Sequence, residues 1–590
     1  MPKIELYRDS LFDFMRASMN DAELEAILEA AKGELDEPTD AEGVMKIELN
    51  DTNRPDLWST AGLGRQLRVY LGGEIPEYDF FSTAEKEQDT AGRTVVVDEG
   101  LKEIRPFIVA FTVSGKAITD AALRDLIQSQ EKLCTNYGRH RKSIAMGVYR
   151  TDLMEFPVRY IAADPDATRF VPLGLETELN LRQIIAEHPK GQEYGQIVSD
   201  FARMPFLTDS RGEVLSFPPI INSARVGAVE VGDTNLFVEM TGTEIESLLL
   251  AASIVACDLS DAGHTIGPVA VEYPYDTPLG RRVVTPYYFQ TDARASLATV
   301  STLLGEEISE AVAGESLRKM GIRAVVNNGV ITARTPEYRN DFLHEVDLAE
   351  DVMMGRGMQT FAPEMPSDFT IGRLTPEEEF GRQAIEVMVG LGFQEMIFPY
   401  LGSHVDLVER MRPVPLAADF SGRDVAVVRI SNPMSENYAC IRSSILPYLL
   451  GSESVSGHAA YPHSIFEVGK VVRFDESDVH GAATINSLGF ITADANASFT
   501  QVSGLLSVLF YYLSREFNVE ETDDPRFIPG RAALLMMATD DDGAKQVGVF
   551  GELHPQVLEN YGVQVPCTAC DLDLDRILHL EQPGQLHETL

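Results

Sequence analysis

Basic residues are scarce in this 590-residue chain, in which 49 Lys and Arg stand against 91 Asp and Glu for a net charge of −42. No lysine lies between Lys190 and Lys319 or between Lys319 and Lys470. A charge of this sign disfavours binding of a phosphate backbone at low salt. The acidic residues are spread along the whole chain, which is typical of an extreme halophile, because molar salt shortens the Debye length to about 3 Å and screens their repulsion. A uniform excess says little about local basic patches.

Cysteine is also rare: five residues in a chain of this length are consistent with a reducing cytosol rather than a disulfide framework. Cys567 and Cys570 form a CxxC pair, but no second pair or His follows at metal-ligand spacing, so we interpret them as ordinary thiols. No window approaches the roughly 18 apolar residues of a membrane span, and we find no signal peptide. We therefore expect a soluble, cytoplasmic protein that does not bind a membrane.

Hydrophobic and turn patterns divide the chain into four predicted domains. Residues 1–85 form a small N-terminal α/β domain, and 93–270 form a larger α/β domain. Residues 275–362 form a compact domain with two short helices about a tight turn, and 370–590 form a C-terminal domain with a largely antiparallel sheet. The proline-rich residues 361–371 predict the linker before this last domain. The fold class is therefore multi-domain α/β (α+β).

An acidic stretch at residues 336–351 contains the most suggestive cluster of carboxylates. If the stretch is helical, Asp347, Glu350 and Asp351 share one face, with Asp341 a little under two turns upstream. Like charges at this spacing repel unless a cation lies among them, and carboxylates without cysteine suit a hard ion such as Mg²⁺. A solvated acidic helix face is the alternative interpretation. A standalone Mg²⁺-dependent enzyme acting at this cluster is a further one.

Two turn-rich segments of the second domain could line a pocket. In Phe217-Pro-Pro-Ile-Ile-Asn222, two prolines constrain an extended turn that is followed by an asparagine. The segment 238–243 leaves a predicted strand at 230–240 through a Thr-Gly turn. Structural turns are the commoner cause of such patterns, so both explanations stay open.

The compact third domain suggests one more function. Helices predicted at 297–304 and 309–320, followed by a β segment at 324–333, are similar to a winged-helix-like arrangement. A nucleic-acid-binding module is therefore an alternative function, although no basic recognition helix accompanies the pattern.

Five ordered motifs give the chain a resemblance to a known family. It resembles the beta subunit of phenylalanine–tRNA ligase in its archaeal and eukaryotic form, with a composition like that of a haloarchaeal member. The similarity covers essentially the whole chain, and the motifs lie at 47–58 (Ile-Glu-Leu-Asn-Asp-Thr-Asn-Arg-Pro-Asp-Leu-Trp), 217–223, 336–341 with 347–351, 442–447 (Arg-Ser-Ser-Ile-Leu-Pro) and 465–470 (Ile-Phe-Glu-Val-Gly-Lys).

The resemblance implies an activity and a partner. It implies a complex of two alpha and two beta chains that attaches L-phenylalanine to tRNA(Phe) with ATP and Mg²⁺. The aminoacylation site is expected on the alpha subunit, with no aminoacylation catalytic residue in this chain. The C-terminal domain would be a class II synthetase-like relic that contributes an interface. This agrees with the lack of a GxGxxxR or a convincing Arg-x-Glu motif in residues 373–590.

The resemblance also implies two sites in this chain. The acidic helix of the family holds Mg²⁺, and its ligands match Asp341, Asp347, Glu350 and Asp351. The second domain resembles the family's editing domain, which hydrolyses tyrosine mischarged on the tRNA, as a second sieve for what the first site admits. The implied wall residues of this editing pocket are Leu207, Ser216, Asn222, Glu239 and Thr241.

Overall fold

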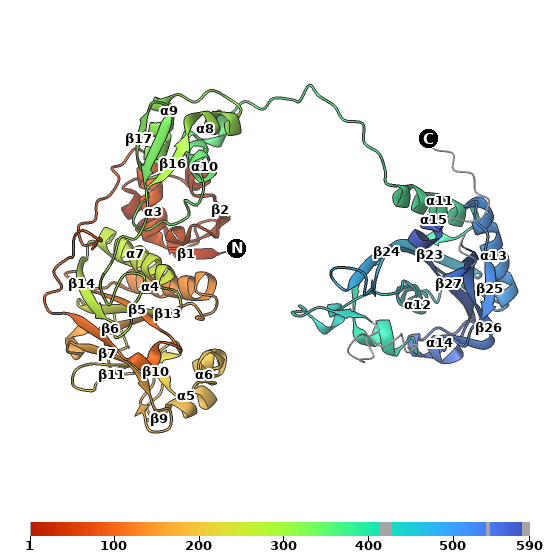
Figure 1. The fold of residues 1–590 in the computed structure, drawn as a ribbon, viewed down its shortest axis with the longest axis horizontal. Helices are drawn as coiled ribbons and strands as arrows, with labels where there is room; N and C mark the ends of the chain where they lie inside the picture. Colours follow the sequence, from red (N-terminus) through yellow and green to blue (C-terminus); the bar gives the residue numbers. More distant parts are fainter. Residues whose placement is uncertain (1, 413–426, 459, 539–542, 581–590) are drawn as a thin grey trace. The chain divides into compact units, whose positions relative to one another are not determined.

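The computed structural model describes residues 2–412, 427–458, 460–538 and 543–580. The chain divides into a first unit, Met1–Met365, and a second unit, Pro366–Leu590, with the boundary inside the predicted linker at 361–371 (Figure 1). Among the described helices, none is both long and apolar enough to cross a membrane.

The first unit begins with a small three-stranded sheet covered by helices. Its antiparallel strands are ordered β1-β3-β2, and β3 alternates so that Met45, Ile47 and Leu49 are buried. Helices α1 and α3 pack closely at Gly64, which has no side chain in the way: a Cβ there would lie only 2.4 Å from the Phe14 Cβ. The elements are β1 (Lys3–Tyr7), α1 (Arg8–Met15), α2 (Asp21–Leu28), β2 (Gly33–Glu37), β3 (Val44–Leu49) and α3 (Thr60–Tyr70).

A large mixed sheet follows, ordered β12-β11-β10-β7-β4-β14-β5-β13-β6, with β15 paired to β14. Strand β4 runs parallel to β7 and β14, and the other pairs are antiparallel. The strands are β4 (Thr94–Val97), β5 (Phe107–Ser114), β6 (Ile144–Arg150), β7 (Val158–Ala163), β10 (Met204–Thr208), β11 (Val214–Phe217), β12 (Ile221–Asn222), β13 (Leu236–Gly242), β14 (Thr265–Glu272) and β15 (Arg282–Thr285). The predicted strand at 230–240 therefore begins only at Leu236.

Helices join this sheet to the N-terminal one. Helix α7 (Ile245–Asp261) is almost wholly buried and contacts both β5 and β13. Arg65 of α3 reaches it, with Nη1 lying 3.1 Å from Asp258 and 2.9 Å from Asp261. The remaining elements here are α4 (Asp120–Lys132), η4 (Leu133–Tyr137), β8 (Arg169–Phe170), β9 (Leu179–Asn180), α5 (Leu181–Glu187) and α6 (Pro189–Tyr194).

The first unit ends in two helices, a three-stranded sheet and a third helix. The predicted β segment at 324–333 is a hairpin, because Asn328 and Gly329 both have positive φ and form its two-residue turn. The predicted acidic helix begins only at Glu345, with His344 as its N-cap. The elements are β16 (Ala293–Ser296), α8 (Leu297–Leu304), α9 (Glu310–Lys319), β17 (Arg323–Asn327), β18 (Val330–Arg334) and α10 (Glu345–Arg356).

The second unit is built on a seven-stranded sheet ordered β19-β23-β24-β28-β27-β26-β25. Among the described strands of this sheet, only the β19–β23 pair is parallel, so the predicted largely antiparallel sheet is confirmed. The strands are β19 (Gln394–Glu395), β23 (His463–Phe474), β24 (Ala482–Ala493), β25 (Asn518–Glu521), β26 (Phe527–Ala538), β27 (Ala544–Leu553) and β28 (Cys567–Asp573). Cys567 and Cys570 are buried free thiols on β28.

Helices flank this second sheet, and a smaller three-stranded sheet accompanies it. The helices are α11 (Pro376–Gly390), α12 (Leu446–Val455), α13 (Phe499–Tyr512), α14 (Pro555–Tyr561) and α15 (Leu574–His579). The small sheet is β20 (Leu401–Gly402), β22 (Cys440–Ile441) and β21 (Val428–Arg429). A fully buried Arg442 binds Glu467 of β23 through two hydrogen bonds of 2.9 and 2.8 Å.

Candidate functional site

A cavity of about 140 Å³ opens in the large sheet of the first unit, where the turn after β11 meets β6 and β13. Ser216 of β11, Asn222 of β12 and Glu239 of β13 line it, so the fold brings together three of the five residues that the sequence predicts for an editing pocket. The other lining residues are Gln130, Arg141, Ala145, Met146, Leu173, Phe217, Pro218, Pro219, Ile220 and Ile221.

Glu239 is the polar centre of this cavity. Its side chain is buried, and its Oε1 lies 2.8 Å from the Tyr149 hydroxyl, which lies another 2.8 Å from Ser216 Oγ. A phenol has one proton, so Tyr149 donates to Glu239 and accepts from Ser216. The second carboxyl oxygen, Oε2, is buried with no partner among the described residues. Such an atom is costly unless something binds it.

Burial changes the chemistry of Glu239. Desolvation raises the pKa of its carboxyl to about 7, against smaller lowering effects from the Tyr149 hydroxyl and the Arg105 charge. Near neutral pH the group is therefore present in both protonation states. The carboxylate accepts a hydrogen bond from a ligand hydroxyl, and the neutral acid donates one.

A glycine leaves room for this arrangement. Gly147 of β6 pairs with Glu239 of β13 across the sheet. A Cβ at this position would lie 2.0 Å from the Tyr149 hydroxyl oxygen and 2.5 Å from Glu239 Oε1, so any side chain here would displace these two groups from each other.

The two other predicted pocket residues lie beside the cavity rather than in its wall. Leu207 of β10 is fully buried and pairs with Ser216 across the β10–β11 ladder. Thr241 of β13 is also fully buried, and its Oγ1 accepts a hydrogen bond of 3.0 Å from Arg105 Nε. Both therefore position the strands that hold the cavity residues.

Sequence reasoning missed Tyr149, Gln130 and Arg141. Gln130 Nε2 donates to the Met146 carbonyl at 2.5 Å, and Arg141 Nη1 donates to the carbonyls of Pro219 and Ile220 at 3.1 and 2.9 Å. One signal was readable: a glycine inside the apolar strand 144–149 indicates close approach of another group, and Tyr149 lies on the same face two residues later.

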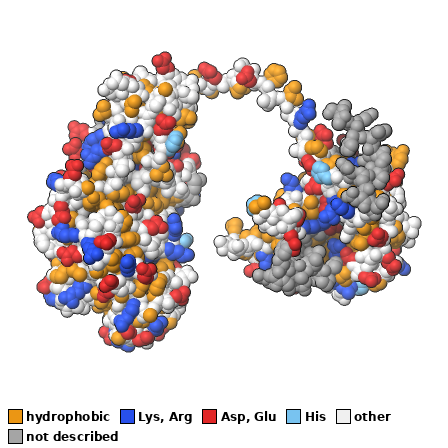
Figure 2. All heavy atoms as spheres, viewed as in Figure 1, with side chains coloured by type: hydrophobic (Ala, Val, Ile, Leu, Met, Phe, Trp, Pro, Cys, Tyr) orange, Lys and Arg blue, Asp and Glu red, His pale blue; other side chains and the backbone are white. Residues whose placement is uncertain are grey.

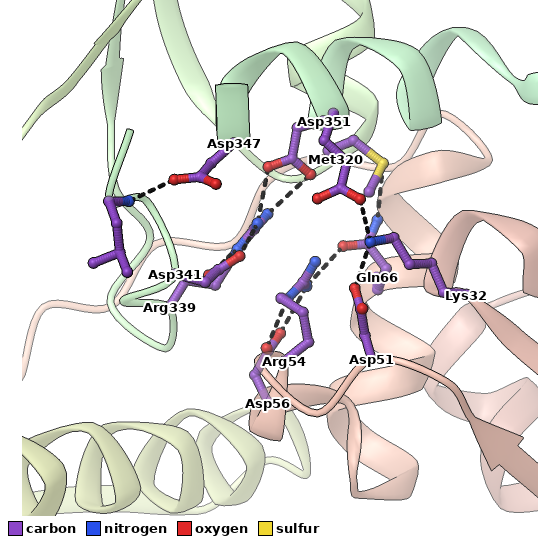
Figure 3. A network of polar contacts seen from close by, with 12 residues as sticks. Lys32, Asp51, Arg54, Asp56, Gln66, Met320, Arg339, Asp341, Asp347 and Asp351 are labelled. Atoms are coloured by element: carbon purple, nitrogen blue, oxygen red, sulfur yellow. Dashed lines mark hydrogen bonds and ion pairs between the residues drawn. The ribbon is translucent and has the colours of Figure 1, made fainter. Parts of the chain in front are cut away.

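The acidic cluster lies in a separate part of the first unit, where α10 meets the N-terminal module (Figure 3). Arg339 is buried between Asp341 and Asp351 and binds both, with its Nη2 at 2.6 and 2.8 Å from their oxygens. Burial favours a higher pKa for Asp341, but Arg339 and then Arg54 outweigh it and hold that pKa at about 2. Arg54 itself pairs with Asp56.

The two remaining carboxylates of the cluster also have partners. Asp347 Oδ2 accepts the backbone N–H groups of Leu343 and His344, each at 2.6 Å, and so caps the start of α10. Glu350 forms an ion pair with Lys32, whose Nζ also lies 2.6 Å from Asp51. The four predicted ligands are thus near one another but already neutralised or hydrogen-bonded.

This arrangement does not fit a metal ion as it stands. In the part of the chain that the structure describes, no three His, Cys, Asp or Glu side chains are placed to hold one. The small cavity between Arg54, Arg339 and Lys32 is only about 20 Å³, about the room that one water needs. A metal ion would have to displace Lys32 from Glu350, and the predicted Mg²⁺ site stays a prediction.

Two alternative sites have less support. A larger cavity of about 520 Å³ lies between the N-terminal module and helices α4 and α7, but its most buried carboxylates are already bound. Asp125 accepts from Thr60, and Asp258 accepts from Ser59 and Arg65.

Helix α9 carries basic residues only in its last turn, where Arg318 binds Glu315, so it lacks the charge of a recognition helix.

Comparisons with family models locate two known domains. A model described as "tRNA synthetase B5 domain" matches residues 293–358. A model described as "Phenylalanyl tRNA synthetase beta chain CLM domain" matches residues 362–574. The first match contains α10 and its carboxylates, and the second contains the seven-stranded sheet.

Similar proteins extend the match to the whole chain. The phenylalanine–tRNA ligase beta subunit of Borrelia hermsii (strain HS1 / DAH) is 44% identical over 580 residues, which cover 98% of this chain and 100% of that protein. That of Borreliella burgdorferi (strain ZS7) is 42% identical with the same coverage. An N-terminal fragment of the phenylalanyl-tRNA synthetase beta subunit from Pyrococcus horikoshii aligns with a TM-score of 0.56 and 34% identity, and covers 60% of this chain and 100% of the fragment.

Proposed function

The chain belongs to the phenylalanine–tRNA ligase beta-subunit family, and from this premise we propose that it acts with an alpha subunit to attach phenylalanine to tRNA(Phe) and itself removes mischarged tyrosine. ATP and Mg²⁺ would be used at the aminoacylation site of the alpha subunit. The assembly would contain two chains of each kind. Full-length similarity to proteins of this name supports the first part of the proposal.

The unpaired Glu239 Oε2 is the observation that carries the editing part. A tyrosyl group in the cavity would bring a phenolic hydroxyl to this oxygen. A phenylalanyl group would leave the buried oxygen without a partner, and discrimination by a lost hydrogen bond of this kind is strong. Glu239 would therefore select tyrosine for hydrolysis and spare the correct product.

The hydrolysis itself requires only water. The bond that breaks joins the tyrosyl carbonyl carbon to the terminal ribose oxygen of the tRNA. Water adds its hydroxyl to that carbon and its proton to the ribose oxygen, which releases tyrosine and free tRNA. In this proposal Ser216 and Tyr149 orient Glu239 by hydrogen bonds, and Asn222 borders the bound group. No side chain is required to form a covalent intermediate.

The test compares charging and clearance in the complex of this chain with its alpha partner. We expect Glu239→Ala to keep phenylalanine charging within about twofold and to slow deacylation of tyrosyl-tRNA about 100-fold, on the scale of losing a specific buried hydrogen bond. Glu239→Gln keeps the shape and tests the carboxyl itself. Glu272→Ala, an exposed position on β14, is the matched control.

Three results would decide between the parts of the proposal. Normal clearance of tyrosyl-tRNA by Glu239→Ala would remove Glu239 from the pocket. Absence of clearance by the unchanged complex would remove editing altogether. Absence of phenylalanine charging by the complex would overturn the synthetase assignment itself.

A further inference from the structure

We propose that the exposed basic residues Arg139, His140 and Lys142 bind phosphates of the tRNA acceptor end and so guide its terminal ester into the Glu239 cavity. We call these three residues the basic rim. The inference rests on the proposed editing function, because the polyanion that the rim would bind is the tRNA that carries the mischarged tyrosine.

The rim lies at the edge of the cavity. Residues 138–143 connect η4 to β6, and Arg141 in their middle lines the cavity and bonds to the carbonyls of Pro219 and Ile220. Its guanidinium carbon lies 4.2 Å from the centre of the Tyr194 ring. The rim residues flank this anchored arginine on both sides and are exposed, and Ala145 just beyond them also lines the cavity.

The local charge is opposite to that of the molecule. Arg139-His-Arg-Lys142 is a run of four basic side chains in a chain whose net charge is −42. Within the described residues, neither His140 nor Lys142 has an ion pair, and Arg139 has only a contact of 4.0 Å with the exposed Glu244. Lys142, without an ion pair among the described residues, and Arg139, with one long contact to an exposed carboxylate, leave positive charge beside the cavity, which concentrates polyanions there.

The backbone holds the rim in a strained conformation. Arg139, His140 and Arg141 have φ values of 51°, 54° and 65°, a left-handed region that side-chain-bearing residues seldom adopt in succession. Hydrogen bonds maintain it: the His140 N–H donates to the Thr135 carbonyl and the Arg141 N–H to the Cys134 carbonyl, at 2.9 and 2.8 Å. Buried Arg105 also donates to the Lys142 carbonyl at 2.9 Å. Conformations of this kind are concentrated at functional sites.

The chemistry of the rim fits phosphate contact rather than base reading. Long basic side chains on a fixed loop position a nucleic acid by its backbone and carry no sequence information. The cavity behind them admits only a small group, so the tRNA must end at the cavity with its last phosphates outside. The rim supplies positive charge at that place.

The test is deacylation of tyrosyl-tRNA by the complex with the double variant Arg139→Gln/Lys142→Gln, measured over a series of KCl concentrations. We expect KM to rise about tenfold while kcat stays within about twofold, because the rim binds substrate away from the ester. We also expect the slope of log(kcat/KM) against log[KCl] to become shallower by about 1.4, the value for two lost contacts to a single strand.

A matched control and a second readout make the result decisive. Lys102→Gln/Arg159→Gln removes two exposed charges from the same sheet module away from the cavity and should leave both quantities unchanged. A wild-type KM and salt slope in the rim variant, or equal losses in the control, would overturn the proposal. If the unchanged complex does not deacylate tyrosyl-tRNA, the editing proposal fails, and binding of an acceptor-stem minihelix then tests the rim. Weaker binding only in the rim variant supports the rim proposal. Equal binding by all variants overturns it.

Discussion

Glu239 shows how one buried carboxyl combines a cost to stability with a capacity to bind. Its Oε1 is held by Tyr149, its Oε2 has no partner among the described residues, and Arg105 lies close enough only to offset part of the desolvation. The protein keeps an uncompensated group in its interior, which is typical of functional sites rather than of cores selected for stability.

This cost gives a prediction about pH. The pKa of Glu239 is raised from 4.5 to about 7 in the folded protein, so the folded protein binds more protons than the unfolded chain between these values. Stability therefore falls as pH rises through this window, by up to about 3 kcal/mol from this residue. We expect Glu239→Gln to lose this part of the pH dependence. Urea unfolding followed by fluorescence of Trp58, the single tryptophan and buried in the first unit, measures it.

The outcome at the two ends of the window is specific. Below about pH 5 Glu239 is protonated in the folded protein, so the wild type keeps the stability that this titration contributes. By pH 8 the wild type should have lost the whole contribution of up to about 3 kcal/mol, while Glu239→Gln should show no such loss. Parallel curves for the two proteins between pH 5 and 8 would show that Glu239 keeps an ordinary pKa.

The acidic cluster gives a prediction about metal. If Mg²⁺ binds there, we expect Asp347→Asn to lower the Mg²⁺ content of the purified protein and to weaken assembly with the alpha partner. Lys32→Ala should raise the content, because it frees Glu350 and Asp51 for the ion. Elemental analysis after dialysis against Mg²⁺ measures the Mg²⁺ content of both variants. Glu307→Gln, an exposed acidic residue outside the cluster, is the control.

Equal Mg²⁺ in all four proteins would mean that basic side chains, namely Arg339, Arg54 and Lys32, balance the charge of the cluster without a metal ion. Asparagine at 347 can still cap α10, so a loss of Mg²⁺ there reports on charge and not on a broken helix.

At the scale of elements, helix α10 is held in place by a buried arginine that does not belong to it. Arg339 precedes the helix and joins Asp341 to Asp351, while the Phe342 ring lies 4.3 Å from its guanidinium carbon. Figure 3 shows Arg54 next to this group, on the side of the N-terminal module. The helix, the loop before it and the first module therefore share one network of charges.

We expect Arg339→Met to destabilise the first unit by about 3–5 kcal/mol, because it removes the cation that is bound to both Asp341 and Asp351. Arg318→Met removes an arginine bound to one exposed glutamate and should cost less than about 1 kcal/mol. Urea unfolding monitored through Trp58 compares the two. Adding Asp351→Asn to Arg339→Met should recover part of the loss; no recovery would mean that packing of the arginine stem, not its charge, stabilises α10.

At the scale of the whole molecule, the acidic charge lies on the surface of each unit. Figure 2 shows Asp and Glu side chains scattered over the visible face of both units, interspersed with Lys and Arg. A net charge of −42 distributed in this way acts through long-range repulsion rather than through any one contact.

We expect the melting temperature of the chain to rise when KCl increases from 0.1 to 1 M, because the Debye length falls from about 10 Å to about 3 Å and the repulsion is screened. Sucrose at equal osmolarity separates this effect from general exclusion of solute. A melting temperature that does not change with KCl, or that rises equally in sucrose, would contradict the halophilic interpretation of the composition.

Local patterns predicted much of the fold because they depend on neighbours in the chain. The helices predicted at 297–304 and 309–320 correspond to α8 and α9, whose bounds lie within one residue of the predicted ones. The helix was expected to start near residue 336, but it starts at Glu345. Residues 339–341 form a loop instead, in which Arg339 donates hydrogen bonds to Asp351 of the helix. That contact joins residues twelve apart and has no periodic signature.

The sequence alone therefore predicted most of the helices and strands, the linker at 361–371 and the family, and the family resemblance placed Ser216, Asn222 and Glu239 in one pocket together with Leu207 and Thr241. Only the tertiary structure decided what these residues can do. Tyr149 and Gly147 of β6 reach Glu239 across paired strands, and the basic rim reaches the cavity through a loop. Charge balance at Arg339 and the unpaired Glu239 oxygen depend on burial, and burial is set by the packing of segments far apart in the chain rather than by any local pattern of residues.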